Sequence, residues 1–234
     1  VSTEPFKKAL GETSKALADS KDLEVSFSSE KSAFKDGNAT LPQISKKMTM
    51  NEILVARGTA DSHALRNRYS NDRIYNQYLP KGELVAKIYE TMESARCEAI
   101  GITDMSGTAS NINSRIANEA TRNGYDNSAS NFNDFLSEAV GLYIKEILTK
   151  KPSPEATSKL LDYWRPIIEE QTSGSLENLE SDIGSQKLYA KHIRQFLREM
   201  GYGDQLGEDP DDASSENNDE DSSESTEDSS LEDQ

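Results

Sequence analysis

Apolar side chains recur every three to four residues along most of this 234-residue chain, which is the spacing of one face of an α-helix. The stripe is clearest between residues 83 and 99, where the apolar positions are Leu84, Ile88, Met92, Ala95 and Ala99. Glycine, proline and asparagine interrupt the pattern and set the ends of the segments. This period predicts helices over residues 3–19, 53–69, 72–79, 83–99, 130–149, 152–171 and 175–200, with a shorter one inside 107–130.

Near the start of the chain the period shortens to two residues. Apolar and polar side chains alternate over 23–28, as in a half-buried strand, and a second short strand is expected over 39–44. Asp36-Gly37 supplies turn residues between the two, and Pro42 is typical of an edge strand because it has no amide hydrogen to donate. The sequence therefore predicts a mainly α domain over 1–203, with a small β-hairpin near its N-terminus.

Charge divides the chain into two parts. Residues 204–234 hold 14 of the 42 acidic residues and no Lys or Arg, so the preceding 203 residues carry 28 acids against 26 bases. A body so close to neutral gives no reason to expect binding to nucleic acid or to an anionic membrane, both of which need a basic surface. The acidic, serine-rich segment has almost no apolar surface to bury, and we expect it to be a disordered linker or tail.

Cysteine usage and hydropathy point to the cytoplasm. The single cysteine, Cys97, excludes an internal disulfide and fits a reducing compartment. It lies within a predicted helix with no histidine nearby in sequence, which favours a buried structural residue over a reactive thiol. No apolar run approaches the ~18 residues that span a bilayer, and no secretory signal opens the sequence.

The stretch 57–80 is unusually dense in arginine and tyrosine, with four arginines and three tyrosines in 24 residues. It is expected to form two helices joined by a tight corner, with a cap at Ser70-Asn71-Asp72 and a stop at Pro80. One interpretation is a solvated face on which Arg57 pairs with Asp61 across one turn. The other is a recognition surface for a protein partner, since arginine and tyrosine concentrate binding energy at interfaces. Its members would be Arg66, Arg68, Arg73, Tyr75 and Tyr78.

Other motifs give no support for chemistry within this chain. Asp104-Met-Ser-Gly-Thr108 is similar to a Mg²⁺-binding loop, but it follows a helix where that loop follows a strand, and we interpret it as a helix end and a turn. No phosphate-binding Gly-x-x-x-x-Gly-Lys-Ser/Thr sequence occurs, so the chain is not expected to hydrolyse ATP itself. His63 and His192 are far apart and lack neighbours at metal-ligand spacing, which predicts no metal site.

Several short runs, in order along the chain, carry a family resemblance. They are Arg57-Gly58, Asp61-Ser62, Ala64-Leu65-Arg66, Pro80 and Ala95-Arg-Cys-Glu-Ala-Ile-Gly101, supported by residues 5–10, 23–27 and 188–202. With these runs the chain resembles, over roughly residues 4–205, the amino-terminal region of the large, CobT-type subunit of aerobic cobaltochelatase.

The resemblance implies a function that the residues alone do not. It implies a subunit of the ATP-dependent enzyme that inserts Co²⁺ into hydrogenobyrinic acid a,c-diamide during aerobic cobalamin synthesis. In that family this subunit couples an AAA+ ATPase subunit to a large ring-binding subunit, and an acidic linker leads to a metal-binding domain. The complex would use ATP, Mg²⁺ and Co²⁺, with no catalytic residue and no cofactor in this segment, which we expect to be the amino-terminal part of a longer protein or a truncated version of one.

A rival hypothesis uses only the charge distribution. It treats the chain as a non-enzymatic, chaperone-like binding module whose acidic tail captures basic proteins. Continuation of the gene into a metal-binding domain, or corrin-synthesis genes beside it, would favour the chelatase subunit over this rival.

Overall fold

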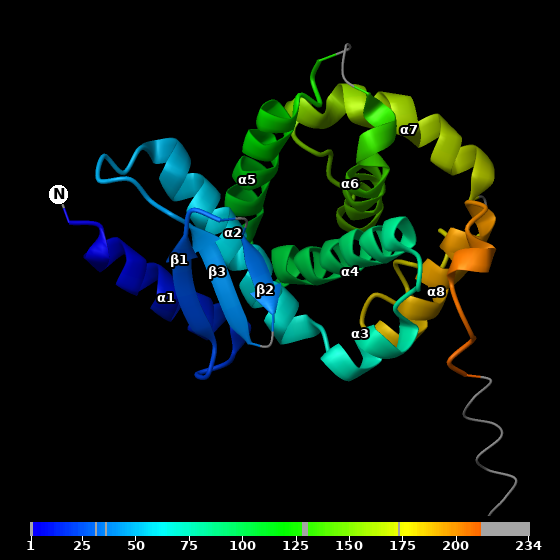
Figure 1. Ribbon diagram of the computed structural model, residues 1–234, viewed down its shortest axis with the longest axis horizontal. Helices are drawn as coiled ribbons and strands as arrows, with labels where there is room; N and C mark the ends of the chain where they lie inside the picture. Colours follow the sequence, from blue (N-terminus) through cyan, green and yellow to red (C-terminus); the bar gives the residue numbers. More distant parts are fainter. Residues whose placement is uncertain (1, 31, 36, 128–130, 173, 212–234) are drawn as a thin grey trace, which may run out of the picture.

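The computed structural model describes residues 2–30, 32–35, 37–127, 131–172 and 174–211 (Figure 1). Within these residues the fold is mainly helical with a small sheet near the N-terminus, as predicted. The helices are α1 Glu4–Ala18, α2 Met50–Tyr69, α3 Asp72–Tyr78, α4 Glu83–Asp104, α5 Gly107–Asn123, α6 Leu136–Thr149, α7 Ser158–Gln171 and α8 Gln186–Glu199. The strands are β1 Glu24–Ser28, β2 Ala33–Lys35 and β3 Asn38–Pro42.

The sheet differs from the predicted hairpin. Its order is β1-β3-β2, with β1 parallel to β3 and the unpredicted β2 antiparallel to β3, so the hairpin is formed by β2 and β3. The assignment of Pro42 to an edge strand is wrong, because β3 is central. Proline is tolerated there because the pairing with β2 ends at Ala33 and Thr40, two residues before Pro42, so this pairing requires no amide hydrogen from it. Its neighbour Gln43 donates to the Ser28 carbonyl on the β1 side at 2.8 Å.

Several helix boundaries also differ from the predicted ranges. Helices α6 and α7 begin at Leu136 and Ser158, each six residues later than expected, and 3₁₀ turns precede them. Helix α4 continues past Gly101 to Asp104, because the missing side chain of Gly101 leaves room for Leu65 of α2. Helix α5 fills most of the segment that was expected to be a short helix flanked by loops. Helix α8 starts at Gln186 rather than near residue 175, with the Ser185 hydroxyl accepting from the Leu188 amide at 3.4 Å as its N-cap.

Helix α4 lies at the centre of the larger core, against α2, α6 and α8 (Figure 1). Its side chains Val85, Ile88 and Met92 are fully buried there. Two smaller apolar clusters join α1, the sheet and α2, and α2 also contributes Leu65 to the larger core. This position makes the C-terminal half of α2, and the corner that follows it, the junction between the two parts of the fold.

The chain remains packed beyond the predicted domain boundary at residue 204. Residues Gly203–Gln205 form a 3₁₀ turn, and the Leu206 side chain that follows is only 2% exposed. The Gln205 carbonyl accepts from the amides of Lys81 and Gly82 at 3.1 and 3.2 Å. The expectation of a disordered acidic segment therefore does not apply to residues 204–211, and for 212–234 it lies outside the described residues.

Candidate functional site

The arginine- and tyrosine-rich stretch folds as predicted into two helices joined by a corner. Helix α2 ends at Tyr69, and the Asn71 side chain caps α3 by accepting from the amides of Arg73 and Ile74 at 3.0 and 3.2 Å. Gln186 of α8 fixes this corner, since its side-chain oxygen accepts from the Asn71 amide at 2.7 Å. Its amide group donates to the Ser70 hydroxyl at 3.0 Å.

Two of the five predicted contact residues, the partly buried Arg66 and the buried Tyr78, act within the fold. The Arg66 guanidinium is 3.2 Å from the Glu93 carboxylate and lies 4.3 Å above the centre of the Tyr75 ring. Tyr78 is fully buried, and its hydroxyl donates to Asp211 at 2.9 Å. Burial, with Asp211 adding to it, raises the pKa of Tyr78 to about 12. Both side chains therefore have partners inside the fold.

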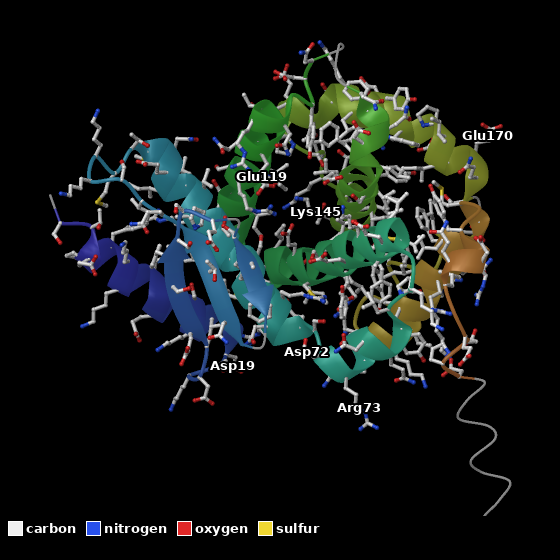
Figure 2. All side chains as sticks on the ribbon, viewed as in Figure 1. Asp19, Asp72, Arg73, Glu119, Lys145 and Glu170 are labelled. Carbon is white, nitrogen blue, oxygen red and sulfur yellow. The ribbon has the colours of Figure 1, made fainter. Side chains whose placement is uncertain are left out.

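Arg68 and Arg73 are the exposed members of the set, while Tyr75 is half-buried. The Arg68 guanidinium donates to the Leu17 carbonyl of α1 at 3.2 Å. Arg73 points away from the helices (Figure 2). The exposed cationic surface at the α2–α3 corner therefore consists of these two arginines.

Asp61 was expected on a solvated face beside Arg57, but it is only 5% exposed. It accepts from the Asn111 side chain of α5 at 2.8 Å, while Arg57 lies over the Phe6 ring of α1. Helix α5 covers this side of α2 because Gly58 leaves space for the Asn111 carbonyl and the Arg115 side chain. A face that reads as polar in sequence is thus buried.

A cleft of about 780 Å³ lies between α2, α4, α5 and α6, with the end of β2 at its rim. Its centre is the Glu98 carboxylate of α4, which accepts from the Ser62 hydroxyl at 2.7 Å and from Arg115 at 2.9 Å. The Lys145 ammonium is 3.6 Å away from the same carboxylate. Figure 2 shows Lys145 and Glu119 on the two helices, α6 and α5, that flank this space. Sequence reasoning did not find the cleft.

The charges around Glu98 support one another. Burial raises the pKa of the Glu98 carboxyl, but Arg115 and Lys145 outweigh it, so the net shift is downward and the group stays ionised. Burial lowers the pKa of Lys145, and Glu98 opposes that shift. Burial, together with the nearby Arg115 charge, lowers the pKa of His63 at the edge of the cleft to about 4. The imidazole is therefore neutral at physiological pH.

A second buried network lies on the same helix, next to the cleft. Glu93 is 1% exposed and receives two hydrogen bonds from Arg96, each 2.8 Å long, in addition to the contact with Arg66. Arg96 also donates to the carbonyls of Tyr69 and Ile183. Through these contacts Glu93 and Arg96 connect α4 to the end of α2 and to the segment before α8. Glu93 and Arg96 lie between the apolar residues of the stripe over 83–99, and this placement is the sequence signal that could have revealed the buried network.

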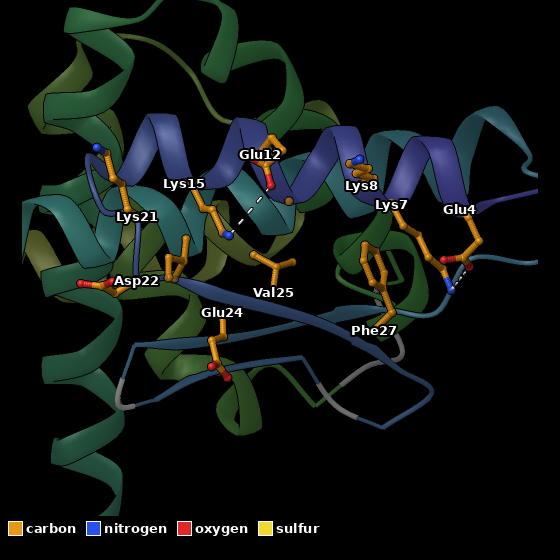
Figure 3. A pocket seen from close by; sticks show the side chains of 12 residues that line it. Glu4, Lys7, Lys8, Glu12, Lys15, Lys21, Asp22, Glu24, Val25 and Phe27 are labelled. Carbon is orange, nitrogen blue, oxygen red and sulfur yellow. Dashed lines mark ion pairs between the residues drawn. The ribbon is translucent and has the colours of Figure 1, made fainter.

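A groove of about 920 Å³ runs between α1 and β1 (Figure 3). Four of its eight charged side chains are paired along α1, Lys7 with Glu4 at 3.5 Å and Lys15 with Glu12 at 3.9 Å. Lysines and acids balance in its lining, which gives the groove no preference for either sign of ligand charge.

The remaining candidates for chemistry have structural roles. Cys97 is buried, and burial followed by the Glu93 charge raises its pKa to about 12, so its thiol stays protonated. Asp104 lies in the last turn of α4 and accepts from the Tyr69 hydroxyl at 2.9 Å. Within the described part of the chain, no three His, Cys, Asp or Glu side chains are grouped so as to hold a metal ion.

The comparison with protein families identifies what the chain is. A family described as "Cobalamin biosynthesis protein CobT" matches residues 1–234. The chain belongs to this family. CobT membership connects the helical domain to cobalamin biosynthesis, in agreement with the resemblance found in the sequence. No solved structure matches the chain. Among the described residues, no helix is long and apolar enough to cross a lipid bilayer.

Proposed function

We propose that the chain is the amino-terminal part of a cobaltochelatase subunit that couples an AAA+ ATPase subunit to the ring-binding subunit. The reaction of the complex would be ATP-dependent insertion of Co²⁺ into hydrogenobyrinic acid a,c-diamide, the formation of nitrogen–metal bonds by a ligase. In this proposal the segment itself is non-catalytic, acts in the cytoplasm, and leaves ATP and Mg²⁺ to the other subunits, with Co²⁺ as substrate. Membership of the CobT family across the whole chain carries the proposal.

The α2–α3 corner supports a coupling role because its arginines are exposed to solvent while hydrogen bonds from α4 and α8 hold its backbone. Arg68 and Arg73 lie in solvent, where arginine is a favoured anchor for a protein partner. Beneath them, Arg96 donates to the Tyr69 carbonyl and Gln186 binds Ser70 and Asn71. A displacement of the corner by a bound ATPase would therefore be passed to α4 and α8, because close-packed, hydrogen-bonded elements transmit strain.

The cleft next to the corner adds a second connection. Ser62 and Arg66 of α2 contact Glu98 and Glu93 of α4, and Glu98 in turn contacts α5 and α6 through Arg115 and Lys145. In our proposal this charge network keeps the four helices in one arrangement, so that force applied at α2 moves the bundle as a unit.

The test is a calorimetric titration of the AAA+ ATPase subunit with the parent chain and with Arg68→Ala and Arg73→Ala variants. Loss of an arginine anchor is expected to weaken association by about 1 to 2 kcal/mol, roughly five- to thirtyfold in Kd, with unchanged thermal melts. Arg122→Ala on α5 is the matched control, since Arg122 is also an exposed arginine on a helix but lies outside the corner. Parent-like binding by both corner variants would remove the corner from the proposal.

A further inference from the structure

Residues 203–211 cross the surface formed by α3, the start of α4 and α8. Leu206 is buried in this surface, and the Gln205 carbonyl is bound by the amides of Lys81 and Gly82. Gly201 and Gly207, with φ of 88° and 74°, supply backbone turns on either side that other residues rarely adopt. The segment lies against the helices as a bound peptide would, with one apolar side chain inserted and the rest held by polar contacts.

Arg194 of α8 recognises the main chain of this segment. It is 3% exposed, and its guanidinium donates to three successive carbonyls, of Leu206 at 3.1 Å, Gly207 at 3.3 Å and Glu208 at 2.9 Å. The same guanidinium donates to the Tyr78 carbonyl at 3.4 Å, so its hydrogen bonds in the described part of the chain go to carbonyl oxygens. Because this buried cation hydrogen-bonds to carbonyl oxygens, its binding does not depend on the side chains of the ligand. It can therefore bind the main chain of an extended peptide of any sequence.

Side-chain specificity comes from the cations on the exposed side of α8. Asp211 is 2.6 Å from Lys191 and 3.2 Å from Lys187, and Asp209 is 3.3 Å from Arg198. These three cations are 53%, 43% and 42% exposed for Lys187, Lys191 and Arg198, so water and salt reach them freely. The contacts select carboxylates three and five residues after the apolar anchor, but they do not lock the segment in place.

We propose that the surface between α3 and α8 is a docking site for acidic peptide segments, and that residues 205–211 are its exchangeable occupant in cis. The partner that fits is an extended polypeptide with a leucine-sized side chain followed, three and five residues later, by carboxylates. Charge complementarity and the seated cis segment define this chemistry. The inference does not depend on the cobaltochelatase proposal, because it rests only on contacts within the chain.

The experiment changes the occupant and leaves the docking surface intact. A fluorescent peptide with the sequence of residues 203–211 is titrated with the full chain carrying Leu206→Ala and Asp211→Asn, and with the parent chain. A tethered ligand competes at an effective concentration in the millimolar range, so we expect at least about tenfold tighter peptide binding to the weakened variant than to the parent. Raising the salt concentration should weaken this binding, as expected for exposed charge contacts.

Two controls give the result its meaning. A peptide with Leu206→Ala, Asp209→Asn and Asp211→Asn should bind at least about tenfold more weakly, and Lys187→Gln with Lys191→Gln in the weakened chain should reduce binding about fivefold or more. Hydrogen exchange at the Lys81 and Gly82 amides, which donate to the Gln205 carbonyl, reports in the absence of peptide whether the cis segment has left. If these amides stay protected in the weakened chain, or if they exchange freely and the peptide does not bind, the site is not exchangeable and the proposal is wrong. Equal binding of the two peptides would also overturn it.

Discussion

Replacing Glu93 by glutamine tests whether Arg66 and Arg96 are structural residues. The substitution keeps the size of the side chain but removes the one carboxylate that both guanidiniums contact, at 2.8 and 3.2 Å. Glutamine also turns one acceptor oxygen into an NH₂ group that faces N–H donors. Two cations that are 2% and 15% exposed, on Arg96 and Arg66, then lack a buried counter-charge.

Breaking a buried ion pair by removing one partner costs about 3 to 5 kcal/mol, and we expect the lower end, about 3 kcal/mol, because glutamine retains one acceptor. For a domain of this size that corresponds to a fall in Tm of roughly 6 to 12 °C. Urea unfolding gives the free energy, and an unchanged m-value shows that the native state keeps its compactness.

The matched control is Glu83→Gln on the same helix. Glu83 is 90% exposed and lies 3.6 Å from Lys87, which is itself well exposed, and exposed pairs of this kind contribute at most about 1 kcal/mol. A Glu93→Gln chain that unfolds within about 1 kcal/mol of the parent would refute the reasoning, and Arg66 would become a candidate contact residue again.

Three further predictions follow from buried groups outside this pair. Gly58→Ala should destabilise the chain by about 1 to 3 kcal/mol in urea unfolding, because its methyl group would meet the Asn111 carbonyl, whereas Gly107→Ala, with open space around it, should have little effect. His63 has a pKa lowered from 6.5 to about 4 by burial and then by Arg115, so the folded state binds fewer protons than the unfolded state between these values. The contribution of the neutral imidazole to the free energy of unfolding is present above pH 6.5, and about 2 to 3 kcal/mol of stability is lost as the pH falls towards 4. A His63→Gln chain that loses stability as steeply as the parent over this window would contradict the assignment. Cys97, with its pKa raised to about 12, should react with a thiol reagent at pH 8 far more slowly in the native chain than in denaturant, and fast native labelling would show that the α4 core is open.

Helix positions were predictable because most of the apolar side chains follow a helical period that one buried face requires. The stripe over 83–99 lies on the buried side of α4 except at Leu84, which is 40% exposed. Asn71 caps α3 as its residue type indicates. The helix boundaries that were predicted wrongly depend on contacts between segments that are distant in the sequence. Gly101 reads as a helix end, yet it lies inside α4 because Leu65 needs the space, a fact that local sequence does not contain.

The sheet and the site were harder to predict for the same reason. Strand β2 has three residues, too few to set a period, and without it the parallel pairing of β1 with β3 could not be inferred. In 57–80, residue type identified an unusual segment but not its exposure. Asp61 is polar in sequence and buried in the fold, and Arg66 is partly buried, because carboxylate or amide partners on other helices satisfy them.

The carboxyl-terminal boundary illustrates how charge can mislead. Residues 204–211 are acidic, and composition alone predicts that they bury nothing. The buried Leu206 side chain and ion pairs with Lys187, Lys191 and Arg198 keep this segment packed on the fold. These basic residues lie on α8, and composition alone does not show that they face the acidic segment.

The most direct test of the central claim is a Co²⁺-insertion assay reconstituted from the AAA+ ATPase subunit, the ring-binding subunit and the protein that contains this chain. Coupling by this subunit predicts no ATP-dependent formation of the cobalt corrinoid when that protein is left out. It also predicts that Arg68→Glu combined with Arg73→Glu lowers the rate at least about tenfold, while the thermal melt and the Arg122→Glu control stay at the parent values. Undiminished insertion without the protein would contradict the account, and undiminished insertion with the double variant would contradict the role of the α2–α3 corner.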